Sequence, residues 1–509
     1  MPSGFALLDW IVFASYFLML AITSVLLSQT KIKNTRDYFV GSNTMPMLAV
    51  AISVLATSQS AATFLGGPEY SYRYDLTFMG FYLSGFLGVL FVSKVLIPRF
   101  YDIKAVTVYE LLEVRYGPAA KKQAGVMFLI GRLFASGARL YIGALAISMI
   151  LFGDIAAMHV ALSVAVLMAG AMAYTYFGGI RSVVFSDIIQ AITYTGAGIA
   201  LLVYLFYAVG ADLSAIVSML DTDGKLRLLD FSMDFSSAGK FSIFGLLSGW
   251  LLLNIAAFGM DQDMTQRVLS CKDRKEGAKS LIYSIVFTIP VALLFLLIGL
   301  LLYLYYHHPE LSGYVSESPD QSFQGEKITI LMYYILNEMP EGLRGLVTVG
   351  AVAAALSSTN SVLGAMSSVA IEDLYKPWKM RRSVQGESHF VKAARISVIV
   401  FAVLLSAMAM LSYYWQRYSD LPLLSFALGV MAFAYSGLLG VYFSAIFTRR
   451  GSEKTVLWAL IGGFLTVLML QPYILGTITE YRVGFSWQIV IATAVSFAIM
   501  QTGRVKRKV

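Results

Sequence analysis

Apolar segments of about twenty residues recur along the whole chain, and no other feature restricts its fold as strongly. A helix needs about 20 mainly apolar residues to cross the hydrocarbon layer of a bilayer. Only 13% of the residues are charged, well below the usual share in soluble domains, so a soluble fold is excluded. We predict an all-α polytopic membrane protein, a single domain over residues 1–509, whose spans lie at 6–28, 47–72, 77–98, 124–152, 155–177, 182–208, 241–262, 280–306, 342–371, 390–413, 421–447, 454–474 and 484–502.

The positions of the basic residues predict the orientation in the membrane. Most of the 38 Lys and Arg residues fall in the loops after odd-numbered spans and in the tail "GRVKRKV". Because basic loops stay in the cytoplasm, we expect the N-terminus outside and the C-terminus inside. The net charge of +8 then needs no nucleic-acid partner. We expect a multi-pass protein of the plasma membrane, in a bacterium the inner membrane.

The sequence holds no recognisable catalytic constellation. It has one cysteine, Cys271, and four histidines that show no metal-ligand spacing. The motifs HExxH, GxSxG, CxxC and the Walker loop do not occur. We therefore do not expect an enzyme.

Two spans are interrupted by polar residues. The second contains "AISVLATSQSAATFLGG" (51–67), and the seventh contains "LNIAAFGMDQD" (253–263). Interrupted helices in corresponding positions are typical of transporters built from inverted repeats. A separation of five spans predicts a 5+5 core, with repeats at 47–208 and 241–447, an additional N-terminal helix at 1–28 and two C-terminal helices at 454–502.

The polar run of the second span predicts an ion or substrate site at residues 56–60. A helix unwinds in hydrocarbon only where another group satisfies the freed backbone atoms, and an ion or a solute does so. The alternative is close helix packing, in which small Ser, Thr and Ala residues are common.

A second polar cluster lies in the ninth span, "VGAVAAALSSTNSVLGAMSS". Ala354, Ser357, Ser358 and Ser361 have i, i+3, i+4, i+7 spacing and share one helix face. Hydroxyl and carbonyl oxygens suit a small hard cation, so we predict sodium rather than a transition metal.

Three of the charged residues inside predicted spans are candidates for a functional role. Asp187 in the sixth is a functional candidate, unless it reaches water at the cytoplasmic end. Arg132 and Arg139 in the fourth are seven residues apart and share a helix face. Either arginine fits a substrate carboxylate, or it pairs with Asp261 or Asp263.

Several motifs, in order, resemble those of the sodium/solute symporter family. They are "TRDYFVGSNTMP", "SVLATSQSAATF", "YFGGIRSVVFSDIIQ", "DQDMTQR", "AAALSSTNS" and "SVAIEDLY", and the likeness covers nearly the whole chain. The resemblance implies the LeuT-like inverted-repeat fold and sodium as the coupling ion.

The resemblance also assigns ion-binding residues. The main sodium site would consist of the carbonyls of Ala56, Gln59 and Ala354 and the hydroxyls of Ser357 and Ser358. A second sodium site or the sodium exit route would involve Asp187, Asn360 and Ser361, although Asn360 replaces a serine of the family pattern.

The substrate site is implied more loosely. The residues at matching positions are Ser58, Ser60, Thr63, Asn254, Asp261 and Gln262, together with Arg132 or Arg139. Thr63 and Ala257 depart from the glutamine and the tyrosine of a galactose carrier. The "IGR" context of sialic acid carriers recurs at 130–132, and either arginine favours a carboxylate-bearing solute.

These features predict a sodium-coupled symporter that works as a monomer and imports a small organic acid, such as a sialic acid. A sodium/sugar or polyol symporter is the alternative within the family. A channel-like or sensory membrane protein is the alternative outside it.

Overall fold

The computed structural model describes residues 5–28, 32–233, 241–313, 319, 321–418 and 423–504. In the first half of the chain the helices are α1 (Leu7–Ser28), α2 (Thr35–Val40), the short turn η1 (Gly41–Asn43), α3 (Met47–Ser58), α4 (Ala61–Arg73), α5 (Met79–Asp102), α6 (Glu110–Tyr116), α7 (Pro118–Phe152), α8 (Ala157–Val209) and α9 (Leu213–Thr222).

In the second half the elements are α10 (Ile243–Gly245), the π-turn η2 (Leu246–Trp250), α11 (Leu251–Gly259), α12 (Gln262–Val268), α13 (Arg274–His307), α14 (Pro309–Ser312), α15 (Ile330–Asn337), α16 (Leu343–Ser368), the π-turn η3 (Val369–Tyr375), α17 (Lys376–Met380), α18 (Glu387–Tyr418), α19 (Leu423–Phe447), α20 (Glu453–Met469), α21 (Pro472–Leu475) and α22 (Phe485–Gln501). A two-stranded antiparallel sheet, β1 (Ser322–Phe323) with β2 (Glu326–Lys327), is the only sheet in these ranges.

Within the described residues, eight helices are long and apolar enough to cross a membrane, and two bent helix pairs raise this number to ten. The predicted fifth and sixth spans are parts of α8, which bends at Gly179 where φ is 57°. A side chain there would collide with the backbone oxygen of Tyr38. The predicted twelfth and thirteenth spans correspond to α20 and α22, which have only 17 residues each.

Both predicted helix breaks are present. α3 and α4 meet at 65°, and the helix that ends in α11 meets α12 at 56°. Each new helix begins with a local cap, because backbone N–H groups at its start have no helical partner. Ser60 and Thr63 form a reciprocal capping box on α4, and the Asp261 side chain accepts from the N–H of Asp263 at 2.9 Å.

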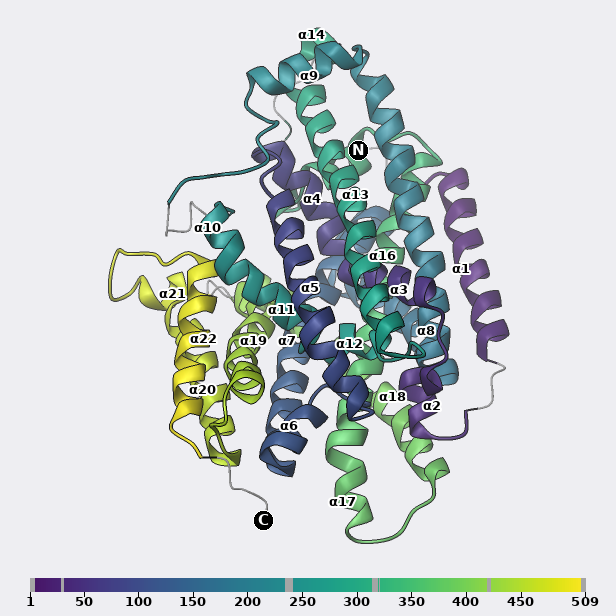
Figure 1. Ribbon diagram of the computed structural model, residues 1–509. Coiled ribbons are helices and arrows are strands. Elements are labelled where there is room, and N and C mark those ends of the chain that lie inside the picture. Colours follow the sequence, from purple (N-terminus) through teal and green to yellow (C-terminus); the bar gives the residue numbers. More distant parts are fainter. Residues whose placement is uncertain are drawn as a thin grey trace.

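The broken helices lie at the centre of the bundle, and the helices outside the predicted repeats lie at its edges. Figure 1 shows α3, α11, α12 and α16 in the middle, with α1 at one side and α20 and α22 at the other. Of all pairs of elements, α16 and α8 pack against each other most extensively. α1 exposes a row of large apolar side chains, as expected of a lipid-facing helix.

One carboxylate attaches α1 to α16. Asp9 is fully buried and accepts from the N–H groups of Gly342 at 2.8 Å and Gly345 at 2.7 Å. It also pairs with Arg344, whose Nη2 lies 3.1 Å from Asp9 Oδ2. The carboxylate therefore caps the N-terminus of α16, where a negative charge is favourable.

Replacing Asp9 by asparagine should lower the thermal stability of the purified protein. The amide loses the charge and at least one of these acceptors, which costs about 1.5–3 kcal/mol for a buried hydrogen bond to a charged group. Thermal unfolding in detergent measures the effect. Glu480→Gln is the control, because Glu480 is exposed and forms no ion pair with the described residues. An unchanged Tm for Asp9→Asn would show that the carboxylate does not anchor α1.

Candidate functional site

A cavity of about 440 Å³ lies beside both helix breaks. Most of its wall is apolar, and aromatic rings from α5 and η2 form part of it. Its polar lining residues are Thr57, Ser58, Ser60, Thr63, Tyr82, Arg132, Ser136, Arg139, Asn254, Asp263, Thr288, Ser358, Thr359 and Tyr435. The cavity therefore joins six of the predicted substrate residues, Ser58, Ser60, Thr63, Arg132, Arg139 and Asn254, with Ser358 of the predicted sodium site.

The break between α3 and α4 leaves two backbone carbonyls available. In a continuous helix the N–H of Ser60 would bond the carbonyl of Ala56, but it donates to Thr63 Oγ1 at 2.7 Å. No hydrogen bond to the carbonyls of Ala56 or Gln59 is found in the described ranges. The side chain of Gln59 lies beside the Tyr82 hydroxyl. Both carbonyl oxygens are thus available to a ligand.

The serine face of α16 contacts α3, the helix that ends at this break. Thr57 Oγ1 of α3 lies 3.0 Å from Ser361 Oγ, which joins the broken helix to this face. Ser357 donates to Asp187 Oδ1 at 2.9 Å, and Ser358 donates to the Ala355 carbonyl at 3.0 Å. Each hydroxyl proton is directed away, so the oxygen lone pairs are free to face a cation.

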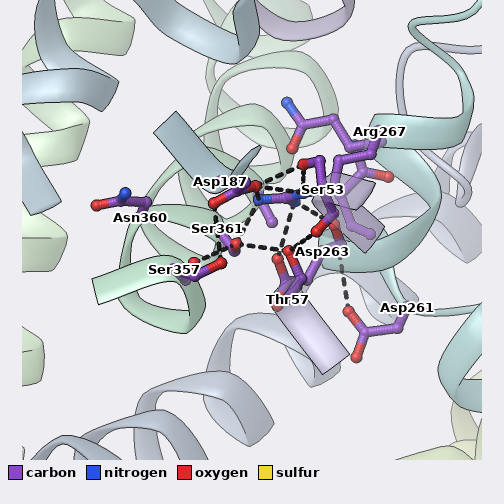
Figure 2. A network of polar contacts seen from close by, with 12 residues as sticks. Ser53, Thr57, Asp187, Asp261, Asp263, Arg267, Ser357, Asn360 and Ser361 are labelled. Atoms are coloured by element: carbon purple, nitrogen blue, oxygen red, sulfur yellow. Dashed lines mark hydrogen bonds and ion pairs between the residues drawn. The ribbon is translucent and has the colours of Figure 1, made fainter. Parts of the chain in front are cut away.

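Asp187 is fully buried, and an arginine compensates its charge. Arg267 Nη2 lies 3.2 Å from Asp187 Oδ2 and also contacts the hydroxyl of Ser361 (Figure 2). The hydroxyls of Ser53 and Ser357 complete the contacts of the carboxylate. Asp187 is therefore not a solvated residue at a span end, and a second cation beside it would have to displace Arg267.

Arg267 did not emerge as a site residue from the sequence. The seventh span is predicted to end at residue 262, which places Arg267 in a cytoplasmic loop. In the structure α12 continues inside the protein, and Arg267 is 0% exposed. The motif "DQDMTQR" was the available signal, because a basic residue four positions after an acid, as Arg267 is after Asp263, can pair with it on a helix.

Asn360 is wrongly predicted as a ligand near Asp187. Its side chain points away from the Asp187 network (Figure 2). The amide nitrogen, in its hydrogen-bonded orientation, donates to the carbonyls of Leu356 and Ala171 at 3.2 Å. The reason is helical rotation, since neighbouring residues of a helix do not face the same side. Ser361 contacts Arg267 beside Asp187, whereas Asn360 lies against Ala171, which precedes the bend of α8 at Gly179.

Gln262 is also wrongly predicted, because it does not reach the cavity. Its Oε1 accepts from the N–H of Val108 at 2.9 Å, while its Nε2 donates to the Val106 carbonyl at 2.9 Å and to Ser368 Oγ at 3.0 Å. These hydrogen bonds connect α12 to the segment before α6 and to the end of α16. Asp261 is likewise fully buried and is not among the residues that line the cavity.

The two candidate arginines have different surroundings. Arg132 is paired with Asp261, which also accepts from the Tyr435 hydroxyl, and its Nη2 lies 3.4 Å from Asp263 Oδ2. Arg139 forms no hydrogen bond or ion pair with any described residue. Its side chain is exposed although it lies deep in the bundle, because the cavity surrounds it.

The charged residues around Asp263 connect three helices. Asp263 Oδ1 lies 3.4 Å from Arg267 Nη1, and its Oδ2 faces Arg132. Contacts thus run from α7 through α12 to Asp187 on α8, across one end of the cavity. A group of three or more His, Cys, Asp or Glu residues fit for a metal is not found within the described ranges.

A bundle with two broken helices that meet at a polar cavity defines a secondary transporter. The sequence profile of the sodium:solute symporter family matches residues 38–463. The chain therefore belongs to this family, and it is a sodium-coupled membrane transporter rather than an enzyme.

Named relatives and a solved structure agree with this assignment. The sodium/sialic acid symporter of Proteus mirabilis (strain HI4320) is 26% identical over 91% of this chain and 89% of its own length. The human sodium-coupled monocarboxylate transporter 1 is 26% identical over 90% of this chain and 72% of its own length. A substrate-bound, outward-open sodium-coupled sialic acid symporter superposes with a TM-score of 0.83 at 23% identity, covering 98% of this chain and 97% of the other. The LeuT-like fold that the sequence predicts is confirmed.

Proposed function

We propose that this protein uses the sodium gradient to import a small carboxylate-bearing solute by alternating access. The observation that carries the proposal is Arg139, a guanidinium that faces the central cavity and has no partner among the described residues. A cation inside the bundle needs an anion or carbonyl oxygens, and a carboxylate matches the planar geometry of guanidinium. Relatives that carry sialic acid or monocarboxylates support the same class of solute.

Sodium would bind between α16 and the end of α3, at the break that separates α3 from α4. Its ligands would be the carbonyls of Ala56, Gln59 and Ala354 and the hydroxyls of Ser357 and Ser358. The free carbonyls at the break support this set. By connecting α3 to α16, the ion would hold the break in the form that presents Ser58, Ser60 and Thr63 to the solute. Sodium binding would thereby raise the affinity for the solute, and the reverse holds by linkage.

Arg139 rather than Arg132 would hold the carboxylate. Arg132 is compensated by Asp261 and Asp263, so a solute that recruited it would leave the buried Asp261 without its arginine. Asn254 would contact the solute from the other broken helix. Rocking of one repeat (47–208) against the other (241–447) would then expose both ligands to the cytoplasm, and Asp187 would lie on the sodium exit route once Arg267 moves.

We further infer that the protein is a monomer in a bacterial membrane. The basic loops indicate that its N-terminus lies outside and its C-terminus in the cytoplasm.

A sugar or polyol symporter is the second candidate, because Ser58, Ser60 and Asn254 are also suited to hydroxyl groups. A channel is distinguished by flux that does not depend on the sodium gradient.

Replacing Ser358 by alanine tests the sodium site. The substitution removes one cation ligand and leaves the fold intact, because the hydroxyl bonds only a carbonyl of its own helix. We expect the sodium concentration for half-maximal uptake to rise about tenfold, which corresponds to about 1.4 kcal/mol. Uptake of N-acetylneuraminate and 3-phenylpropanoate into proteoliposomes, measured against sodium concentration, provides the test.

Thr359→Ala is the matched control, because Thr359 is the next residue and also bonds the Ala355 carbonyl. It is not a member of the proposed sodium set. Unchanged sodium activation in Ser358→Ala, with both variants equally stable, would exclude the proposed ligand.

A further inference from the structure

We infer that the solute is an amphipathic monocarboxylate, with its carboxylate on Arg139 and an apolar body against the rings of Phe81 and Trp250. The inference rests on the proposed function and narrows its substrate class. It excludes polyhydroxylated acids such as sialic acids as the preferred solute. The argument comes from how polar and apolar groups are divided within the cavity.

The polar end of the cavity lies on α7. Arg139 has no partner among the described residues, and the hydroxyl oxygen of Ser136, three residues before it, is buried without a hydrogen bond there. Residues i and i+3 lie on the same helix face. One carboxylate between them would satisfy both groups, because its two oxygens accept from a guanidinium and a hydroxyl at once.

Another part of the cavity wall is aromatic. Phe78, the residue before α5, stacks on Phe81 of α5 with the ring centroids 5.9 Å apart, and Trp250 of η2 meets Phe81 edge-on at 5.4 Å. All three rings line the cavity, and Phe241 stacks on Trp250 at 5.4 Å and supports it. Flat rings held in this way stabilise an apolar or aromatic group by burying its surface.

Elsewhere in the lining, most hydroxyl protons are already donated within the protein. Ser58 donates to the Leu55 carbonyl at 2.7 Å, and Thr63 donates to the Ser60 carbonyl at 2.8 Å. Thr359 and Thr288 donate to carbonyls one turn earlier at 2.7 and 2.8 Å. The Asn254 amide donates to the Trp250 carbonyl at 3.0 Å.

These hydroxyls can still accept a hydrogen bond, but few donors remain for the oxygen atoms of a solute with many hydroxyls. Each hydroxyl that leaves water needs a hydrogen bond in the site. Without one, the cost of its desolvation weakens binding. A single carboxylate needs only the donors at the polar end. Because the polar and apolar groups of the lining are separated in this way, the cavity favours a solute with one polar group at one end. A solute with polar groups along its whole length is disfavoured.

Four carboxylates of the same charge test this inference on the purified full-length protein. The ligands are 3-phenylpropanoate, hexanoate, gluconate and N-acetylneuraminate, and binding is measured by thermal shift and by microcalorimetry in sodium and in choline. We expect sodium-dependent binding of the first two acids at least tenfold tighter than that of the last two. Equal or tighter binding of gluconate or N-acetylneuraminate would overturn the inference and leave the proposed carboxylate symport intact.

A variant pair locates the apolar body. Trp250→Ala should weaken 3-phenylpropanoate binding about tenfold. It should leave the affinity for acetate unchanged, because acetate has no large apolar group to bury. Trp458→Ala is the control, because Trp458 is 62% exposed and lies outside the cavity. Unchanged 3-phenylpropanoate binding in Trp250→Ala would also overturn the inference. If none of the four acids binds in sodium, the proposed function fails together with it.

Discussion

Replacing Arg139 by alanine is expected to weaken sodium-dependent carboxylate binding roughly 100-fold. The loss of one partner of a buried, hydrogen-bonded charge pair costs 2–5 kcal/mol or more, and 1.4 kcal/mol corresponds to a factor of ten. Because Arg139 has no partner in the described chain, its removal should leave the Tm of the ligand-free protein unchanged or raise it. The separation of binding from stability is the diagnostic result.

Calorimetry with 3-phenylpropanoate and N-acetylneuraminate measures the effect, and both acids are used so that the result does not depend on the solute's body. Arg139→Lys should recover part of the affinity, since it keeps the charge and loses the planar fork. Arg482→Ala, in an exposed loop, is the control. Arg132→Ala should instead lower the Tm, because Asp261 would lose its cation. Full carboxylate affinity in Arg139→Ala would make a neutral solute the better candidate.

Replacing Arg267 by alanine is expected to destabilise the protein by about 3–5 kcal/mol, the cost of leaving one partner of a buried ion pair without the other. Asp187 would retain only the hydroxyls of Ser53 and Ser357, and Asp263 would lose one of its two arginines. Thermal or denaturant unfolding in detergent measures the loss. The double variant Asp187→Ala with Arg267→Ala should recover part of it, because no uncompensated carboxylate remains at 187.

Arg274→Ala is the matched control for Arg267→Ala. Arg274 also pairs with an aspartate, Asp102 at 3.7 Å, but both side chains are more than half exposed. Exposed pairs contribute about 0–1 kcal/mol, so the control should change little. Equal effects of the two substitutions, or no recovery in the double variant, would show that burial of Asp187 with Arg267 does not stabilise the fold.

The sequence alone predicted the features that depend on residues close together in the chain. The apolar spans follow from what a bilayer requires of each segment. The breaks at Gln59 and Asp261 follow from polar residues that would otherwise lie in hydrocarbon, and the structure confirms both bends. The shared face of Ser357, Ser358 and Ser361 follows from helical spacing. These predictions hold because the membrane imposes the same constraint on every span, whichever helix lies next to it.

Only the tertiary structure decided which charged and polar groups meet. From the sequence, Arg132 and Arg139 were equivalent, and it is Asp261, 129 residues away from Arg132, that pairs with one and leaves the other facing the cavity. The same holds for Arg267 beside Asp187, and for Asn360 and Gln262, whose amides bond to carbonyls elsewhere. Partner choice depends on how each helix is rotated against its neighbours. That rotation is set by the packing of segments far apart in sequence, which no local pattern encodes.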